Sequence, residues 1–193
     1  MISTDNKIFT VDNFLFPETC KFLIKNFSKD LKPTSKVGIF SGPNADISSG
    51  ANLISGNNKI SNSLNIYDPI SVDLFTSICT NIEKTVSSIF NKNLKLRSYF
   101  YTHMVAGGKN GFHIDNKNYK DDYSAILYLS DDYSGGELYF PKIDTLITPK
   151  PGSLITFFGD SDLMHEVREV INGDRINIVC FLTEGDNDEN KDN

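Results

Sequence analysis

The chain has 193 residues, of which 39% are hydrophobic and 23% are charged, and its formal net charge is −6 at pH 7. This length and composition fit a single globular domain with a sizeable core. A protein that binds a nucleic-acid backbone normally carries a basic face, and no Lys/Arg cluster stands out, so we expect no nucleic-acid partner. The sequence also lacks a signal-peptide pattern and a long apolar run, which predicts a cytoplasmic protein without a membrane span.

The three cysteines are Cys20, Cys79 and Cys180, far apart in the sequence and set in largely apolar stretches. An odd, scattered set of this kind favours neither a disulfide framework nor a zinc site. We therefore expect three reduced core residues in a reducing compartment.

Two amphipathic helices are predicted in the first half of the chain. The first starts near Pro17, a residue typical of a first helical turn, and the second starts at Pro69 with Asp68 as its cap. Residues 33–66 between them are rich in Ser, Gly and Asn, which predicts a mobile lid or a disordered loop. The second helix carries an apolar stripe that is typical of core packing, formed by Val72, Phe75, Ile78, Ile82, Val86 and Ile89.

From about Leu96 the sequence changes to short β-prone runs separated by turn clusters such as "AGGKNG", "DDYSGG" and "PKPG". Short strands spaced in this way predict a sandwich or a jelly-roll barrel. The expected fold is therefore α+β, with supporting helices in an N-terminal part of about 1–92 and a jelly-roll core of about 95–183. Both parts are assigned to one domain, 1–185, and the polar residues 186–193 are predicted to form a flexible acidic tail.

A His-x-Asp triplet, His113 and Asp115, precedes one of the apolar strands. On a strand, residues i and i+2 point to the same face, so the imidazole and the carboxylate would enter one space. His165, much later in the chain, offers a third ligand. Two histidines and one carboxylate on one face of a metal leave the other face open, which suits non-haem Fe(II). The triplet alone is weak evidence, because such pairs also occur by chance on protein surfaces.

A fourth element strengthens the hypothesis. Arg175 follows His165 after the turn "NGD", and it is one of only three arginines in the chain. An arginine returned to the site by this turn would bind a carboxylate through two parallel hydrogen bonds, a geometry that lysine cannot match.

Taken together, the segments "HID", "YSAILYLS", "SGGELYFP", "PKPGSLITFF" and "HEVREVINGDRINIVCFL" resemble the Fe(II)- and 2-oxoglutarate-dependent dioxygenases, in particular their prolyl 4-hydroxylase-like branch. The resemblance covers residues 96–183 well and the first half of the chain more loosely. It implies a double-stranded β-helix, the jelly-roll form of this family. A non-catalytic jelly-roll binding module is the alternative from a different functional class.

The resemblance implies a role for five residues. His113, Asp115 and His165 would bind the iron at the catalytic centre. Arg175 would pair with the far carboxylate of 2-oxoglutarate, and the hydroxyl of Tyr128 would help to hold that carboxylate. Tyr128 also fits a simpler interpretation, an aromatic side chain in the barrel core.

The sequence departs from the family pattern in three places, one of which is Lys59, where many relatives have an arginine before the barrel. Relatives often carry a tyrosine shortly before the first iron ligand, where this chain has His103 and Met104. One co-substrate contact is therefore unassigned, although Tyr99 and Tyr101 are nearby. The animal collagen enzymes use lysine in place of Arg175, so the resemblance leans toward oxygen-sensing, bacterial and viral members.

The activity implied by the resemblance is hydroxylation of an unactivated C–H bond with Fe(II), O₂ and 2-oxoglutarate, releasing succinate and CO₂, with ascorbate as an accessory reductant. Asp115 favours hydroxylation, because related halogenases have a small residue at that position. The leading substrate hypothesis is a prolyl residue in a peptide or protein. The alternative is a free amino acid or another small molecule. The sequence gives no indication of the oligomeric state.

Overall fold

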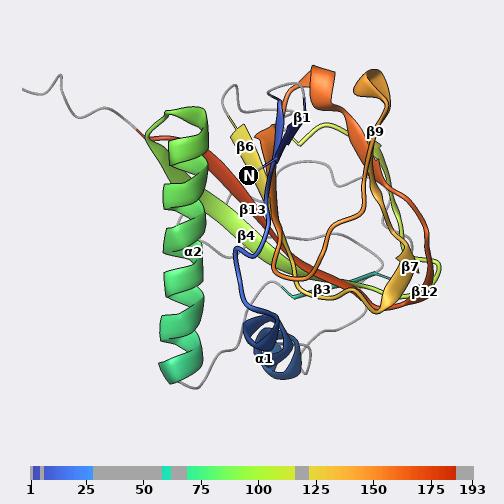
Figure 1. Cartoon of the computed structure of the whole chain (residues 1–193), viewed down its shortest axis with the longest axis horizontal. Coiled ribbons are helices and arrows are strands. Elements are labelled where there is room, and N and C mark those ends of the chain that lie inside the picture. The colour runs from blue at the N-terminus through green and yellow to red at the C-terminus, as the bar shows by residue number, and fades with distance from the viewer. Residues whose placement is uncertain (1, 5–6, 28–57, 62–68, 116–121, 186–193) are drawn as a thin grey trace, which may run out of the picture.

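The structure is a computed structural model that describes residues 2–4, 7–27, 58–61, 69–115 and 122–185 (Figure 1). Both predicted helices are present, as α1 (Pro17–Phe27) and α2 (Pro69–Phe90). The predicted cap Asp68, the acidic tail 186–193 and most of the predicted loop 33–66 lie outside the described residues. The predictions made for them therefore stay predictions.

Seven strands form the larger sheet, in which every neighbouring pair is antiparallel. The long strand β13 lies inside this sheet and pairs with β6 on one side and β4 on the other. In order across the sheet, the strands are β1 (Ile2–Thr4), β2 (Ile8–Val11), β10 (Leu154–Phe158), β6 (Asp122–Tyr128), β13 (Arg175–Glu184), β4 (Leu94–Met104) and β3 (Asn58–Ser61).

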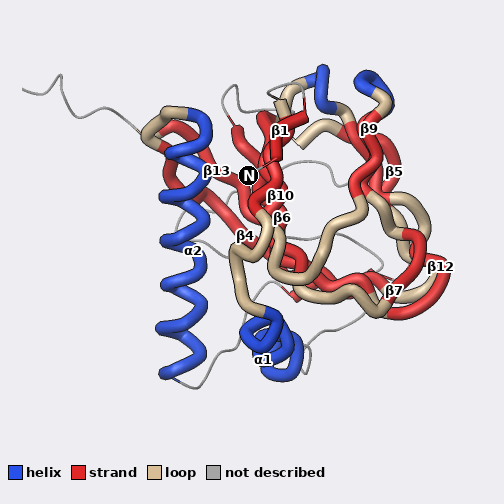
Figure 2. The backbone as a smooth tube through the Cα atoms, in the orientation of Figure 1, coloured by secondary structure: helices blue, strands red, loops and turns tan. Residues whose placement is uncertain are grey.

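A smaller sheet faces the larger one, and the strands of both curve around a common interior (Figure 2). The four strands of the smaller sheet are β5 (Asn110–His113), β11 (His165–Val167), β8 (Leu138–Phe140) and β9 (Thr145–Ile147), in that order. A two-stranded ribbon and two short 3₁₀ turns complete the described fold: β7 (Tyr133–Gly135), β12 (Val170–Gly173), η2 (Pro141–Ile143) and η3 (Ser161–Leu163).

The larger sheet separates two hydrophobic cores. On the helix side, the stripe of α2 packs against alternate residues of the central strands, among them Leu127 and Ile178. The intervening residues Ile126 and Tyr128 of β6 point to the other side, into the interior between the sheets. Because successive side chains of a strand point to opposite faces, one strand serves both cores. The predicted stripe residues Phe75, Ile78, Ile82 and Val86 are all buried.

The N-terminal part contains strands as well as the predicted helices, so the prediction of a helical region over 1–92 was incomplete. Strand β2 adds to the edge of β10 and buries Ile8, while β3 pairs with β4 inside the segment predicted as a loop. Such outer strands are short, and they form because a neighbouring strand offers unpaired backbone groups. The local sequence carries no sign of that partner.

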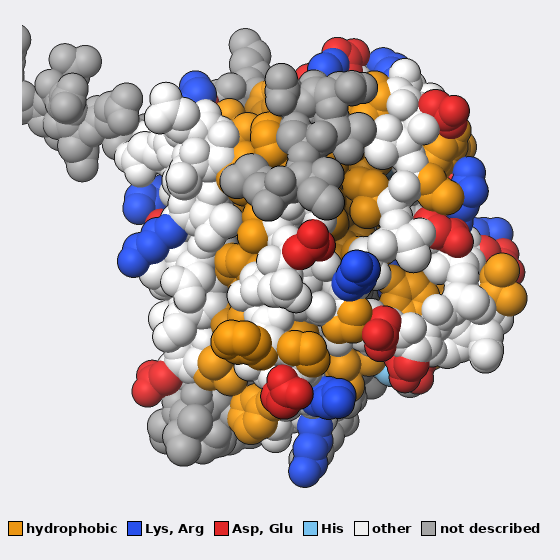
Figure 3. Space-filling model, viewed as in Figure 1, with side chains coloured by type: hydrophobic (Ala, Val, Ile, Leu, Met, Phe, Trp, Pro, Cys, Tyr) orange, Lys and Arg blue, Asp and Glu red, His pale blue; other side chains and the backbone are white. Residues whose placement is uncertain are grey.

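Three compositional predictions can be compared with the described residues. Cys20, Cys79 and Cys180 are all free thiols, as expected. None of the described helices is long and apolar enough to cross a membrane. On the face shown in Figure 3, basic side chains are interspersed with acidic ones, and hydrophobic side chains gather over the region of α1.

Candidate metal and co-substrate centre

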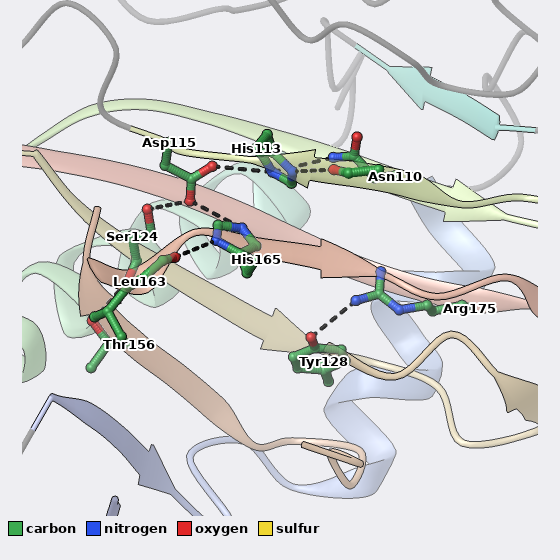
Figure 4. Close-up of polar contacts among 10 residues, drawn as sticks. Asn110, His113, Asp115, Ser124, Tyr128, Thr156, Leu163, His165 and Arg175 are labelled. Carbon is green, nitrogen blue, oxygen red and sulfur yellow. Dashed lines mark hydrogen bonds and ion pairs between the residues drawn. The ribbon is translucent and has the colours of Figure 1, made fainter. Parts of the chain in front are cut away.

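The three predicted metal ligands come together in the interior, beside the smaller sheet (Figure 4). Nε2 of His113 lies 3.4 Å from Oδ1 of Asp115, and Nε2 of His165 lies 3.6 Å from Oδ2 of the same carboxylate. One ligand atom from each side chain lies within 4.8 Å of the others. The described residues therefore bring together a carboxylate and two imidazole nitrogens that could share one metal ion.

The strand register explains why the two histidines meet. His165 begins β11 and lies directly opposite His113, the last residue of β5, in an antiparallel pair. Directly opposite residues project to the same face, so the two rings are neighbours. The backbone setting of Asp115 differs from the predicted one. Strand β5 ends at His113, and Asp115 follows in a bend. The carboxylate reaches the site through this bend and not through the two-residue period of a strand.

Backbone carbonyls fix both imidazoles in the form that binds metals. Nδ1 of His113 lies 2.7 Å from the carbonyl oxygen of Gly111, and Nδ1 of His165 lies 3.0 Å from that of Leu163. A carbonyl oxygen only accepts hydrogen bonds, so each Nδ1 carries the proton. Nε2 is therefore the nitrogen that each neutral imidazole offers to a metal, and it is Nε2 that faces Asp115. This second hydrogen bond is the usual way in which a ligating histidine is oriented.

Asp115 is held as an anion. Its side chain is only 8% exposed, and the hydroxyl of Ser124 donates a 2.6 Å hydrogen bond to Oδ2. Burial acts to raise the pKa of Asp115, but the neighbouring imidazoles of His165 and His113 and the Ser124 hydrogen bond outweigh burial, so the pKa lies below its ordinary value. Ser124 is itself fixed, since its carbonyl accepts a 2.8 Å hydrogen bond from Thr156.

His165 is the most deeply buried of the three ligands. It is 2% exposed, with the rings of Phe140 and Phe157 centred 5.3 and 5.0 Å from its own. Burial lowers its pKa, which keeps the imidazole neutral. The donor set is therefore two imidazoles and one carboxylate, the combination that suits non-haem Fe(II) with open positions.

Arg175, at the start of β13, forms a second polar centre in the interior and is 1% exposed. Its Nε donates to the carbonyl of Gly136 at 2.9 Å, Nη1 to Oδ1 of Asn177 at 2.6 Å, and Nη2 to the hydroxyl of Tyr128 at 3.0 Å. A fourth, weaker contact joins Nη1 to the sulfur of Met104 at 3.9 Å.

All four partners of Arg175 are neutral, and no carboxylate of the described residues forms an ion pair with it. A buried cation without an anion is costly, and such charges are normally paired. The arrangement therefore has the character of an anion site. Tyr128 packs in the core and could also bind an anion. Its hydroxyl oxygen accepts a hydrogen bond from Arg175, and its hydroxyl hydrogen remains available to donate to an anion. Burial raises the pKa of Tyr128, so the phenol stays protonated.

A glycine makes room for the arginine. Gly136 has a φ of +67°, and a Cβ atom there would lie 2.9 Å from Cδ of Arg175 and 3.3 Å from Cε2 of Tyr133. Any side chain would therefore be strained and would push into the guanidinium stem. The turn of the "SGG" segment thus has a direct role in placing Arg175.

The remaining sequence candidates lie outside the centre. His103 pairs with Asp174 at 2.7 Å. Tyr99 and Tyr101 belong to the helix-side core, so neither faces the interior. The interior position on β4 is occupied by Met104, the neighbour of Arg175.

Sequence reasoning missed four residues of the site: Ser124, Asn110, Gly136 and Asn177. Asn177 had a usable signal, because it stands two residues after Arg175 on the same strand and so shares its face. Ser124 and Asn110 had none, since their contacts with the ligands depend on how distant strands meet.

Comparison with known proteins agrees with this geometry. Residues 98–183 match the family model of the 2OG-Fe(II) oxygenase superfamily. Prolyl 3-hydroxylase 2 of Rattus norvegicus is 32% identical over 146 residues, which cover 58% of this chain and 20% of the relative. Prolyl 3-hydroxylase 1 of Gallus gallus is 37% identical over 67 residues, 32% of this chain and 9% of the relative. The chain thus spans about a fifth or less of the length of these relatives.

The fold is shared with solved structures at low sequence identity. A viral collagen prolyl hydroxylase from Paramecium Bursaria Chlorella virus-1, in complex with 2-oxoglutarate, has a TM-score of 0.64 at 17% identity, covering 93% of this chain and 97% of that one. A prolyl hydroxylase from Trichoplax adhaerens, bound to a hypoxia inducible factor peptide, has a TM-score of 0.61 at 17% identity, covering 93% and 84%. The predicted α+β fold with a double-stranded β-helix is confirmed.

The His-Asp-His cluster, the fold and the matched segment 98–183, a little under half of the chain, all agree with the resemblance of this sequence to the 2OG-Fe(II) oxygenase superfamily.

Proposed function

We propose that this domain hydroxylates an unactivated C–H bond, with Fe(II) bound by His113, Asp115 and His165 and with 2-oxoglutarate anchored by Arg175. The observation that carries the proposal is the pairing of two incomplete centres in one interior. One is a three-ligand set that leaves room on the metal, and the other is a buried cation that lacks an anion. A dicarboxylate co-substrate that chelates the metal at one end satisfies both.

When bound, iron together with 2-oxoglutarate and O₂ supplies the oxidising chemistry that hydroxylates the substrate and releases succinate and CO₂, with ascorbate as an accessory reductant. The protein residues do the rest. Asp115 offsets part of the metal charge, and the carbonyl-bound imidazoles stay oriented without reorganisation. Arg175 and Tyr128 fix the far carboxylate, while Phe140 and Phe157 keep water away from His165.

A prolyl residue of a peptide or protein is the substrate that we propose. The proposal is supported by the relatives named prolyl 3-hydroxylase and by structural neighbours named prolyl hydroxylase, one of them solved with a peptide. The names differ in the ring position, since the sequence relatives are 3-hydroxylases and one structural neighbour is a prolyl-4-hydroxylase. We therefore propose hydroxylation of the proline ring. Analysis of the product will show which ring carbon carries the new hydroxyl group.

The test is turnover after anaerobic loading with Fe(II). Wild-type protein, given 2-oxoglutarate and then O₂, should form succinate slowly by itself and faster with a suitable peptide from a proline-rich panel. Mass spectrometry of the peptide and amino-acid analysis should show hydroxyproline and its ring position. Asp115→Ala serves as the inactive control. No succinate from the iron-loaded wild type would reject the oxygenase proposal. If free amino acids stimulate succinate formation and none of the peptides does, the peptide substrate is rejected and the oxygenase proposal stands.

A further inference from the structure

Asn110, the first residue of β5, lies against the metal-facing side of His113 (Figure 4). Its Nδ2 is 3.3 Å from Nε2 of His113. In the neutral form that binds a metal, His113 carries its proton on Nδ1 for the Gly111 carbonyl, so that Nε2 accepts in this contact and the Asn110 amide is the donor. The other polar atom of the amide, Oδ1, is buried and has no hydrogen-bond partner in the described structure.

The contact between Asn110 and His113 is incompatible with a metal on the same nitrogen. A metal ion bound to Nε2 uses the lone pair that now accepts from the amide. The amide then has neither its donor contact nor an acceptor contact among the described residues. Buried polar groups without partners are costly and rare in folded proteins. A ligand on the open side of the metal is the group in position to restore the hydrogen bond.

We propose that Asn110 donates a hydrogen bond to the 2-oxo acid end of 2-oxoglutarate, and so binds the end of the co-substrate opposite to Arg175. A carboxylate oxygen is a strong acceptor for an amide N–H, whereas the C–H group that is hydroxylated offers none. In the proposed function, the far carboxylate is bound by Arg175 and Tyr128. The inference rests on the proposed function and adds to it a residue that holds the chelating end.

Two ligands separate the roles of the two ends. 2-Oxoglutarate carries both ends, whereas 2-oxopentanoate carries the 2-oxo acid end without the far carboxylate. Binding of each to the Fe(II)-loaded protein should be measured by calorimetry without oxygen, and Fe(II) affinity should be measured separately. Asn110→Ala should weaken both ligands by the same factor, roughly 10-fold, as expected for one hydrogen bond to a charged group. Arg175→Ala should weaken 2-oxoglutarate and leave 2-oxopentanoate nearly unchanged.

Asn110→Leu, which keeps the bulk of the side chain, should reproduce the loss if Asn110→Ala proves unstable. Asn172→Ala, at an exposed position on β12, is the matched control and should bind both ligands normally. Unchanged binding of 2-oxoglutarate by both Asn110 variants would overturn the inference. So would a loss of Fe(II) affinity that accounts for the whole effect, because Asn110 would then only orient His113. Failure of the loaded wild type to bind either ligand would instead reject the proposed function, and the inference with it.

Discussion

Ser124 on β6 donates a 2.6 Å hydrogen bond to Oδ2 of Asp115, which connects the larger sheet to the ligand that follows β5. Groups that orient metal ligands in this way typically contribute 10- to 100-fold to metal affinity. Ser124→Ala should therefore weaken Fe(II) binding by roughly 10-fold, measured by anaerobic competition with a chelator. Ser134→Ala, at an exposed position on β7, is the control. Equal iron affinity in Ser124→Ala and wild type would show that the bend alone fixes Asp115.

Asp115→Ala should abolish tight iron binding. The substitution removes the only anionic ligand of the cluster and leaves two neutral imidazoles to hold a divalent cation. Hydroxylation and succinate formation should be lost together with the metal. Asp131→Ala, at an exposed position, should behave like wild type in both measurements. Wild-type iron affinity in Asp115→Ala would mean that the ligand set has been wrongly assigned.

Arg175→Ala should weaken 2-oxoglutarate by roughly 10- to 100-fold, because a hydrogen bond to a charged group contributes about 1.5–3 kcal/mol. Iron affinity should be nearly unchanged, since Arg175 contacts none of the three ligands. Arg175→Lys should recover only part of the loss, because a point charge cannot form two parallel hydrogen bonds. The measurement is the 2-oxoglutarate dependence of succinate formation, with circular dichroism to confirm folding.

Arg168 is the matched control for Arg175. It stands three residues after His165 and stacks on the ring of Tyr139, with its guanidinium carbon 4.4 Å from the ring centre and its side chain 45% exposed. Arg168→Ala should therefore leave 2-oxoglutarate binding nearly unchanged. The reverse pattern, with a large effect from Arg168 and none from Arg175, would contradict the strand register on which the site is built.

The three cysteines should resist alkylation in the folded protein. Burial raises the pKa of Cys20 to about 11 and that of Cys79 to about 12, and it raises the pKa of Cys180 as well. The thiolate is the reactive form, so at about pH 8 all three remain protonated thiols. Iodoacetamide should label them much more slowly than glutathione, and at ordinary rates after unfolding. Rapid labelling of the native protein would contradict this. The cytoplasmic location stays a prediction.

The meeting of His113, Asp115 and His165 was predictable, because the chemistry of the three side chains is informative before their geometry is known. Two histidines and an aspartate of this spacing, with Arg175 after a turn, have few other uses in one domain. The route by which Asp115 reaches the two histidines was not predictable, because the chain leaves the strand pattern immediately after His113. Alternation along a strand can be predicted from the local sequence. The hydrogen bond from Ser124 to Asp115 cannot, because it joins the bend to a different strand.

The long central strands and α2 were also predictable, since their apolar patterns report directly which face is buried. The short outer strands β1, β2 and β3 were not, because the pairing of such strands depends on the neighbouring strand and not on their own residues. The same limit applies to Asn110, whose side chain is ordinary in sequence and becomes notable only beside His113.

The two halves of the site belong to different sheets: His113 and His165 lie on the smaller sheet, whereas Arg175 and Tyr128 lie on the larger one. A dicarboxylate held at both ends therefore acts as a non-covalent cross-link between the sheets. Ligands that bind only the folded state stabilise it by mass action. Iron alone should slow amide hydrogen exchange mainly in β5 and β11. Addition of 2-oxoglutarate should extend the slow exchange to β13, because the co-substrate would then hold the two sheets together at both of its ends.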